Sequence, residues 1–253
     1  MDANFDRVAD IYDATRGFSS EAGQGIAAFI AEKAKLKSTD KLLEVGIGTG
    51  RVAVPLSAHI DHIYGVDIAR LMMQKIHEKS VANTIHLSES DATQLPFADS
   101  SFDACLSVHV FHLIPDMESC MQEINRVLNP EGILLYASGP FGEGFADLNS
   151  VWNQHTPKYT GARNQEQVDE LLTEYGWHIP EIEYQHPLMM QRRPDGLLTA
   201  LKGRVSSQTW RMTDDEIAAA IVDMEAALAE NYPEPDKPVA VESKFHLRVY
   251  QRS

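Results

Sequence analysis

The chain has 253 residues, of which 43% are hydrophobic, and it carries a formal net charge of −15 and two cysteines. This composition is typical of a globular protein rather than a disordered or disulfide-rich one, and the length suffices for one elaborated α/β domain. The excess of acidic residues argues against nucleic acid as a partner, because a protein binds nucleic acid through a basic face. No apolar run reaches membrane-spanning length and the first residues do not resemble a signal peptide, so we expect a cytoplasmic protein without membrane contact.

The N-terminal segment combines aromatic, acidic and basic residues in one short stretch. Residues 5–16 end in Y-D-A-T-R, which resembles the Y-D-x-x-R entry segment of small-molecule methyltransferases that use S-adenosylmethionine (SAM). The resemblance implies that Tyr12 and Arg16 close over SAM, and the guanidinium could supply two parallel bonds to the SAM carboxylate. The alternative is an exposed helix with a surface arginine. A second helix is predicted at residues 21–35 from its apolar face.

A buried strand followed by a glycine-rich turn is predicted at residues 42–50. An apolar run leads into Gly46, Gly48 and Gly50, which occupy alternate positions. Glycine permits a tight turn and lets a ligand lie against bare amides, because no Cβ intervenes. Residues 51–56 predict a helix whose N-terminus would point at that ligand. The segment therefore favours a site for a nucleotide-like molecule, although a purely structural turn also collects glycines.

The glycine spacing argues against a dinucleotide site. Dinucleotide-binding turns follow G-x-G-x-x-G, whereas here the third glycine comes one residue early and Arg51 stands where that pattern has Gly or Ala. An acidic residue, Glu44, also precedes the first glycine by two positions. The resulting E-x-G-x-G-x-G resembles the first motif of class I SAM-dependent methyltransferases. A nicotinamide-dependent oxidoreductase remains the less favoured alternative.

A second strand is predicted at residues 62–67 and ends in the carboxylate of Asp67. In doubly wound folds an acidic residue at this place binds both ribose hydroxyls, because one carboxylate accepts two O–H bonds. The alternative is that Asp67 caps the helix starting near Ala69, and the two roles are compatible. Ile68 and Met72 lie a helical turn apart and could form an apolar wall against adenine.

Further segments resemble the same family, in the family's own order. Residues 84–88 predict a strand that leads into residues 91–97, where D-A-x-x-L-P-F resembles the adenine-contacting loop. Residues 101–110 resemble the fourth strand of the family, usually written F-D-x-V. Residues 127–135 resemble its R-V-L-x-P-G-G element, with Glu131 in place of the first glycine. The resemblance covers residues 5–140 and lies in the branch that includes quinone-biosynthesis and other small-molecule methyltransferases.

Beyond residue 140 the resemblance is thin, and the elements are predicted from pattern alone. They are a long loop at 141–161, a helix at 165–175, a strand at 177–186, a helical insert at 190–232 with a Thr213–Glu216 capping box, and a final strand at 239–250. A long irregular loop in a compact domain is usually functional or disordered. The segments 141–161 and 190–232 are therefore expected to form a substrate-binding lid, with a packed appendage as the alternative.

Strands and helices alternate up to about residue 139, which predicts a doubly wound parallel α/β sheet. The resemblance implies a Rossmann-like sheet of seven strands whose last strand is antiparallel and lies beside the fifth. The ligand is expected at the carboxyl ends of strands one, two and four, the switch point of such sheets. We expect one domain over residues 1–253, with a core at about 36–140, 164–186 and 239–253 and lid elements at about 1–20, 141–161 and 190–232.

Methyl transfer needs a base only when the nucleophile starts protonated, because SAM already carries an activated leaving group. The candidate bases are His109 and His112 at the end of the fourth strand, since histidine titrates near neutral pH. His109 is favoured because alternation from Ser107 points it to the same side. The alternative is a packing or hydrogen-bonding role. A metal site at His109-x-x-His112 is not expected, because no third ligand follows at a characteristic spacing.

The resemblance implies transfer of a methyl group from SAM to a small-molecule acceptor at O, N, C or S, with S-adenosylhomocysteine (SAH) as product. The chain lacks the N/D-P-P-Y tetrad of amino-methylating enzymes of nucleic acids and proteins, which disfavours a polymer substrate. A SAM-binding sensor or partner module without transferase activity is the alternative from another class. The implied cofactor-binding residues are Tyr12, Arg16, Glu44, Gly46, Gly48, Gly50, Asp67, Ile68, Met72, Asp91, Ala92 and Ser107, with Asp91 near the exocyclic amine of adenine.

Overall fold

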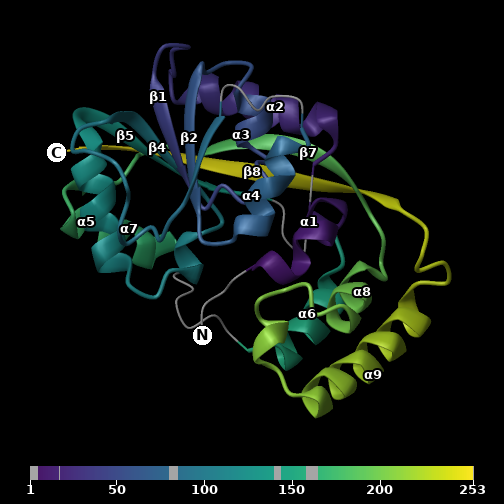
Figure 1. Ribbon diagram of the computed structural model, residues 1–253. Coiled ribbons are helices and arrows are strands. Elements are labelled where there is room, and N and C mark those ends of the chain that lie inside the picture. Colours follow the sequence, from purple (N-terminus) through teal and green to yellow (C-terminus); the bar gives the residue numbers. More distant parts are fainter. Residues whose placement is uncertain (1–4, 17, 80–84, 140–143, 158–164, 253) are drawn as a thin grey trace. The chain divides into compact units, whose positions relative to one another are not determined.

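The computed structural model describes residues 5–16, 18–79, 85–139, 144–157 and 165–252, without the side chains of residues 14–16 and 165 (Figure 1). The strands are β1 (Lys41–Val45), β2 (His62–Asp67), β3 (Ile85–Glu89), β4 (Phe102–Val108), β5 (Leu128–Ser138), β6 (Trp177–His178), β7 (Tyr184–Arg192) and β8 (Val239–Arg252). The helices are η1 (Phe5–Val8), α1 (Ala9–Arg16), α2 (Ser20–Lys33), α3 (Ala53–Leu56), α4 (Arg70–His77), η2 (Phe111–Leu113), α5 (Met117–Val127), α6 (Ala146–His155), α7 (Gln165–Glu174), α8 (Gly196–Lys202), η3 (Thr209–Arg211) and α9 (Asp214–Asn231).

One mixed sheet organises these strands in the order β3-β2-β1-β4-β5-β8-β6, with β7 paired to β8. Strands β1 to β5 pair in parallel, and β8 is antiparallel to both β5 and β6. The Rossmann-like α/β prediction and the antiparallel last strand beside the fifth are confirmed. The seven strands of the ordered path match the expected number, and β7 adds an eighth that the sequence did not predict.

The predicted strand at 177–186 is split in the structure. Trp177 and His178 form the short β6, and a new strand, β7, begins at Tyr184 and continues to Arg192. Pro180 lies in the interruption, where its missing N–H and fixed φ prevent the ladder from continuing. The second half of β7 overlaps the beginning of the segment for which helices were predicted.

The predicted long loop at 141–161 is also wrong for the residues that can be described, because Ala146–His155 forms α6. Leu148 and Trp152 lie four residues apart and pack into an apolar cluster with residues of α8 and α9. Their burial stabilises a helix that the Gly- and Asn-rich composition did not suggest. The predicted capping box of Thr213 and Glu216 is confirmed at the start of α9.

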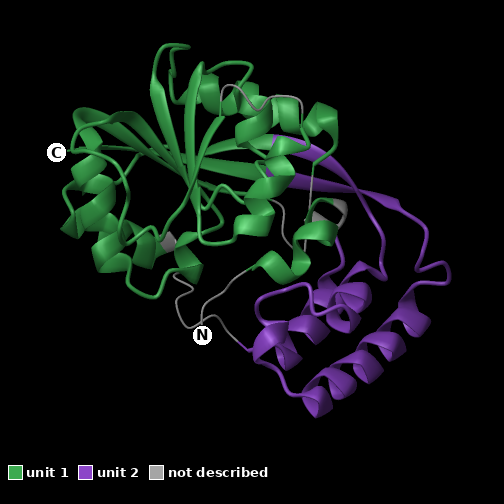
Figure 2. Cartoon of the chain, viewed as in Figure 1, with its two compact units in different colours: residues 1–139, 161–186, 245–253 green, residues 140–160, 187–244 purple. Residues whose placement is uncertain are grey.

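The chain divides into two compact units, drawn in green and purple in Figure 2. Unit 1 comprises residues 1–139, 161–186 and 245–253 and contains β1 to β6 with the helices around them. Unit 2 comprises residues 140–160 and 187–244 and has its own apolar core from α6, α8 and α9. Strands β7 and β8 each run from one unit into the other.

Alternation along the central strands of unit 1 creates a buried face against α5 and α7. Leu43, Val45, Cys105 and Leu134 share one apolar cluster with residues of both helices. Cys105 and Cys120 are buried free thiols. Within the described part of the chain, no helix combines the length and apolar character needed to cross a membrane.

Candidate cofactor-binding site

The glycine-rich turn follows β1 in a backbone conformation that L-residues rarely adopt. Gly46, Gly48 and Gly50 have φ values of +73°, +55° and +71°. A Cβ added at Gly46 would lie 2.2 Å from a methyl carbon of Val110, so this part of the turn is fully packed. A Cβ added at Gly48 would meet Met72 only at 3.5 Å, an ordinary contact. The turn is therefore tightly packed at its first glycine and leaves room for an ordinary contact at its second.

Asp67, at the end of β2, binds the backbone of Gly48, the second glycine of the turn. Its Oδ2 accepts a hydrogen bond from the backbone N–H of Gly48 at 2.8 Å, and its Oδ1 accepts one from Ala69 N at 2.8 Å. Burial raises the pKa of Asp67, and the hydrogen bonds from Ala69 and Gly48 oppose that shift. The structure thus brings the predicted ribose-binding carboxylate into contact with the predicted glycine turn, and Asp67 also binds the residue preceding α4.

Glu44 lies on β1, two residues before Gly46, and is only 2% exposed. Its Oε2 is buried and has no hydrogen-bond partner among the residues that the structure describes. Burial raises the pKa of Glu44 to about 8, while the nearby charge of Arg51 opposes the shift and that of Asp67 adds to it. A buried carboxyl oxygen without a donor is costly, so this atom is an incomplete polar site.

The N-terminal segment binds α4 through acidic side chains that the sequence analysis did not single out. Asp6 Oδ1 accepts a hydrogen bond from Leu71 N at 2.6 Å, at the start of α4. Asp10 pairs with Lys75 at 2.8 Å one turn further along both segments. Asp6 and Asp10 are four residues apart in sequence, and so are Lys75 and Lys79. This helical spacing was the signal in the sequence that could have predicted the contact.

Asp13 extends this contact to the glycine turn itself. Its Oδ2 pairs with Lys79 Nζ at 2.6 Å, and its Oδ1 accepts a hydrogen bond from Thr49 Oγ1 at 2.5 Å. Lys79 Nζ also donates to the carbonyl oxygen of Thr49 at 2.7 Å. Thr49 lies between the second and third glycines, so the N-terminal segment and the turn are held in one polar network.

Two predicted cofactor-binding residues meet in an apolar cluster between the N-terminal segment and α4. Tyr12 and Phe5 pack against the buried residues Ala9, Ala69 and Met72. The rings of Phe5 and Tyr12 meet edge to face with centroids 6.1 Å apart. The structure therefore brings Tyr12 and Met72 together beside the glycine turn.

Of two other predicted residues, one is placed differently and the other has a side chain outside the described part of the chain. Ile68, expected beside Met72, is 41% exposed, whereas Met72 is buried. The side chain of Arg16 lies outside the described residues, so its predicted contact with the SAM carboxylate stays a prediction.

The loop after β3 contains the predicted adenine-contacting residues. Asp91 Oδ1 accepts hydrogen bonds from Thr93 N at 2.9 Å and from Thr93 Oγ1 at 2.8 Å. Such a local side-chain turn fixes the backbone that follows it. Ala92 is half-buried and packs against the main core of unit 1.

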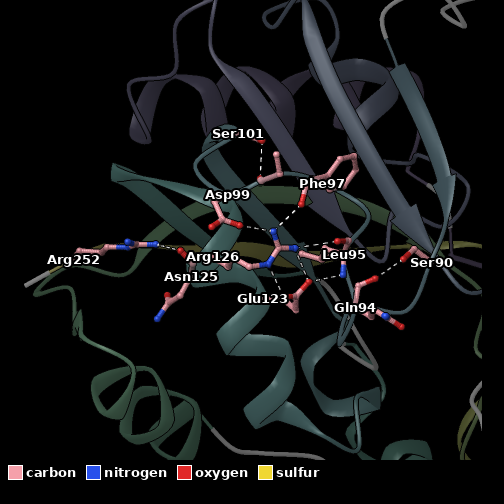
Figure 3. Close-up of polar contacts among 11 residues, drawn as sticks. Ser90, Gln94, Leu95, Phe97, Asp99, Ser101, Glu123, Asn125, Arg126 and Arg252 are labelled. Carbon is pink, nitrogen blue, oxygen red and sulfur yellow. Dashed lines mark hydrogen bonds and ion pairs between the residues drawn. The ribbon is translucent and has the colours of Figure 1, made fainter.

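Arg126 of α5 holds the far end of this loop, as Figure 3 shows. Its guanidinium donates to the carbonyl oxygens of Phe97 at 2.7 Å and Leu95 at 3.0 Å. The same group binds Asp99 and makes two hydrogen bonds to Glu123, whose Oε2 also accepts from Leu95 N at 2.7 Å. The sequence analysis noted the R-V-L element but assigned no role to its arginine.

We predict that Arg126→Ala lowers the free energy of unfolding by about 1–3 kcal/mol, because two loop carbonyls and Glu123 lose their donor. Amide exchange at Leu95 and Phe97 should accelerate in parallel. Arg193→Ala is the matched control, since it removes an arginine paired with Asp195 in unit 2 that binds no part of this loop. Its effect in urea denaturation should stay below about 1 kcal/mol. Equal exchange rates in the Arg126 variant and the wild type would contradict the prediction.

The end of β4 departs from the prediction for His109. β4 ends at Val108, and His109 has a φ of +56°, so strand alternation from Ser107 does not extend to it. Its backbone N–H donates to Ala137 O at 3.2 Å, and its Nε2 accepts a hydrogen bond from Gly139 N at 2.5 Å. The reason for favouring His109 as a base is therefore wrong, because the left-handed backbone reorients the residue and its ring nitrogen already accepts a hydrogen bond.

The two remaining predicted residues also lie at this end of β4. Ser107 is fully buried, and its Oγ has no hydrogen-bond partner within the described ranges. His112 is half-buried within η2. The glycine turn, Asp67 and the end of β4 thus converge at the carboxyl edge of adjacent parallel strands.

Comparison with known proteins identifies this arrangement. A methyltransferase-domain family model matches residues 43–136. The demethylmenaquinone methyltransferase of Lactobacillus johnsonii is 31% identical over 136 residues, which cover 51% of this chain. The aligned part spans 56% of that relative, a little more than half of its length.

Solved structures resemble the whole chain more distantly. The [4+2]-cyclase SpnF has a TM-score of 0.62 and 19% identity, with coverage of 98% of this chain and 93% of its own. The phosphoethanolamine N-methyltransferase 2 of Haemonchus contortus, solved with SAH, has a TM-score of 0.56 and 17% identity, covering 98% of this chain and 57% of that one. At such identities the structural likeness establishes the fold. Together with the geometry of the glycine turn, the family match makes residues 43–136 similar to a SAM-dependent methyltransferase domain, and this similarity supports SAM as the cofactor.

Proposed function

We propose that this protein transfers the methyl group of SAM to a small-molecule acceptor at an O, N, C or S nucleophile, leaving SAH. The observation that carries the proposal is the contact of Asp67 with Gly48 N, at the glycine of the turn where an added Cβ would make only ordinary contacts, the nearest with Met72 at 3.5 Å. A carboxylate and bare backbone amides at the carboxyl end of parallel strands are what a ribose and its neighbouring groups need. The net charge of −15 supports a small acceptor over nucleic acid.

The buried Glu44 supports SAM as the ligand of this turn. Its Oε2 lacks a donor, and the α-ammonium of the methionine part of SAM is a cationic donor of the kind such an oxygen lacks. Asp67 would accept hydrogen bonds from the ribose, Met72 and Ile68 would contact adenine, and Asp91 would accept from its exocyclic amine. These roles are the ones that the methyltransferase resemblance implies for the four residues.

Bound SAM would supply a methyl group on a sulfonium, an activated leaving group. The residues of this chain would hold the acceptor in line with that methyl group and exclude water. We further propose that residues 1–253 act as one methyltransferase domain in the cytoplasm, with the segments 1–20, 141–161 and 190–232 serving as lid elements over the acceptor. The contacts of Asp6, Asp10 and Asp13 with residues 71–79 support the lid role of the N-terminal segment.

A function without methyl transfer is the second candidate. One solved protein of the same fold is named as a [4+2]-cyclase, so the fold is compatible with a reaction other than transfer. Cofactor binding and turnover must therefore be measured separately.

The experiment is calorimetric titration of the purified protein with SAM, SAH and NAD. We expect SAM and SAH to bind and NAD not to bind. Asp67→Ala should weaken SAM binding about 100-fold, because charge-assisted hydrogen bonds to the ribose are lost. Asp61→Ala, which removes an exposed aspartate just before β2, is the matched control and should bind SAM normally. Binding of NAD, or unchanged SAM affinity in Asp67→Ala, would contradict the proposal.

A further inference from the structure

A row of polar residues on β8 forms a network that the methyltransferase resemblance does not explain. His246, Arg248 and Tyr250 stand at alternate positions of the strand. Arg248 pairs with Asp169 at 2.8 Å, and Tyr250 donates to the same carboxylate at 2.5 Å. His246 Nδ1 lies 3.0 Å from Oε2 of Glu183, and Arg248 Nε donates to the other oxygen, Oε1, at 3.3 Å.

The two ends of this network differ in exposure. The Arg248 and Asp169 side chains are 19% and 13% exposed, so they form a nearly buried link between β8 and α7. The His246 and Glu183 side chains are 31% and 30% exposed, which leaves them accessible to a dissolved molecule. The buried pair suffices to join the strand to the helix, and the accessible pair is available for another role.

The register of the sheet places His246 at the edge that carries the candidate site. His246 pairs with Ser138, the last residue of β5, and β5 runs parallel to β4. The carboxyl ends of these strands lie on the same edge as the glycine turn and Asp67. Gly139, the next residue, donates its N–H to His109 Nε2, and β5 is the strand that lies between His246 and the end of β4.

The hydrogen bonds of His109 and His246 differ in whether they leave a ring nitrogen able to accept a proton. His109 Nε2 already accepts from Gly139 N, so it can take a proton only by giving up that bond. In His246 the contact with Glu183 directs Nδ1–H to the carboxylate, and Nε2 then carries the lone pair. A carboxylate behind a histidine fixes the tautomer and stabilises the imidazolium that forms when Nε2 accepts a proton.

Glu183 is suited to this role because it stays ionised. Burial acts to raise its pKa, but the hydrogen bonds from His246 and Arg248 outweigh burial and lower it. The charged groups around the histidine are therefore Glu183 from the segment before β7, Arg248 from its own strand, and Asp169 of α7 behind Arg248.

We propose that His246, oriented by Glu183, is the general base for an acceptor whose nucleophile starts protonated, such as a phenol, an alcohol or a carbon acid. The inference rests on the proposed function and narrows its acceptor class. The proton of the nucleophile passes to His246 Nε2 while the nucleophile forms its bond to the methyl carbon. The bond between that carbon and sulfur breaks, and its electron pair stays on sulfur in SAH.

The test compares His246→Gln and Glu183→Gln with the wild type and with His178→Gln. His178 is an exposed histidine of β6 that pairs with the other end of β8, so its variant controls for loss of a histidine near this strand. SAH binding is measured first by calorimetry, and it should be unchanged in all four proteins. Turnover is then followed as SAH release with nitrocatechol and acetylacetone as protonated probes, and with pyridine as an acceptor that has no proton to lose.

We expect kcat with nitrocatechol to fall about 100-fold in His246→Gln and about 10-fold in Glu183→Gln, with KM nearly unchanged. The loss in His246→Gln should shrink as pH rises and the phenol ionises without help, which a purely structural defect would not produce. His178→Gln should match the wild type.

Three outcomes would overturn the inference. One is wild-type kcat in His246→Gln, and another is a loss that stays constant across pH. The third is a wild-type protein that binds SAH but methylates only pyridine or none of the probes. Failure to bind SAH at all would instead reject the proposed function, so the two failures are distinguishable.

Discussion

Replacing Gly46 by alanine is expected to prevent folding, whereas replacing Gly48 by alanine should preserve the fold and abolish SAM binding. At Gly46 the new Cβ would lie 2.2 Å from Val110, whose side chain packs against the main core of unit 1, and the φ of +73° adds strain. At Gly48 the new Cβ has an ordinary 3.5 Å contact with Met72, and the φ of +55° costs about 1 kcal/mol. The methyl group would occupy the space in which the ligand approaches the backbone.

Thermal unfolding followed by circular dichroism, with SAH calorimetry on each folded variant, tests this pair of substitutions. Gly196→Ala is the control, because a Cβ at the start of α8 meets nothing within 4 Å. It should leave SAH binding intact and change stability by less than about 1 kcal/mol. A Gly48→Ala protein with wild-type SAH affinity would remove the turn from the cofactor site.

Glu44 is expected to make the stability of the ligand-free protein fall as pH rises. Its pKa is raised from 4.5 to about 8 in the native state by burial, so between these values the native state holds a proton that the unfolded state has lost. The stabilisation is fully present below pH 4.5 and is lost as pH rises through about 8. At about 1.4 kcal/mol per pKa unit, the whole shift corresponds to roughly 4–5 kcal/mol.

Urea denaturation across this pH range, in the wild type and in Glu44→Gln, measures the effect. The glutamine variant should lack this part of the pH dependence. Glu89→Gln, at the exposed end of β3, should retain it. Parallel pH profiles in all three proteins would contradict the assignment.

The same group predicts proton release on SAM binding. The ammonium of SAM favours ionised Glu44, so binding below pH 8 should release up to one proton. Calorimetry in two buffers with different ionisation enthalpies detects this release, and it should disappear in Glu44→Gln. Identical binding enthalpies in the two buffers for the wild type would show that Glu44 does not face the cofactor's charge.

Local patterns predicted the parts of the structure that depend on neighbouring residues in sequence. The alternating apolar residues of 42–45 and 239–250 were sufficient for β1 and most of β8, and Thr213 with Glu216 predicted the start of α9. The proximity of Asp67 to the glycine turn could be predicted, because consecutive parallel strands end at the same edge of the sheet.

The contacts that were missed depend on residues far apart in sequence. Arg126 of α5 donates to the carbonyl oxygens of Leu95 and Phe97, in the loop before β4. No local pattern in the sequence predicts these contacts. Asp13 binds Lys79 and Thr49 from the N-terminal segment for the same reason. The alternation argument for His109 fails because it was carried one residue past the end of β4, where the backbone becomes left-handed.

The place of β8 between β5 and β6 has a consequence for the order of folding. β8 pairs with Leu134–Ser138 of β5, although it follows β5 at a large distance in sequence. A nascent chain that has not yet passed residue 252 therefore presents β5 as an unpaired edge, and such edges pair readily with other chains. Pairs so distant in sequence also form slowly. The period before β8 inserts is thus when chaperone capture and aggregation compete with completion of the sheet.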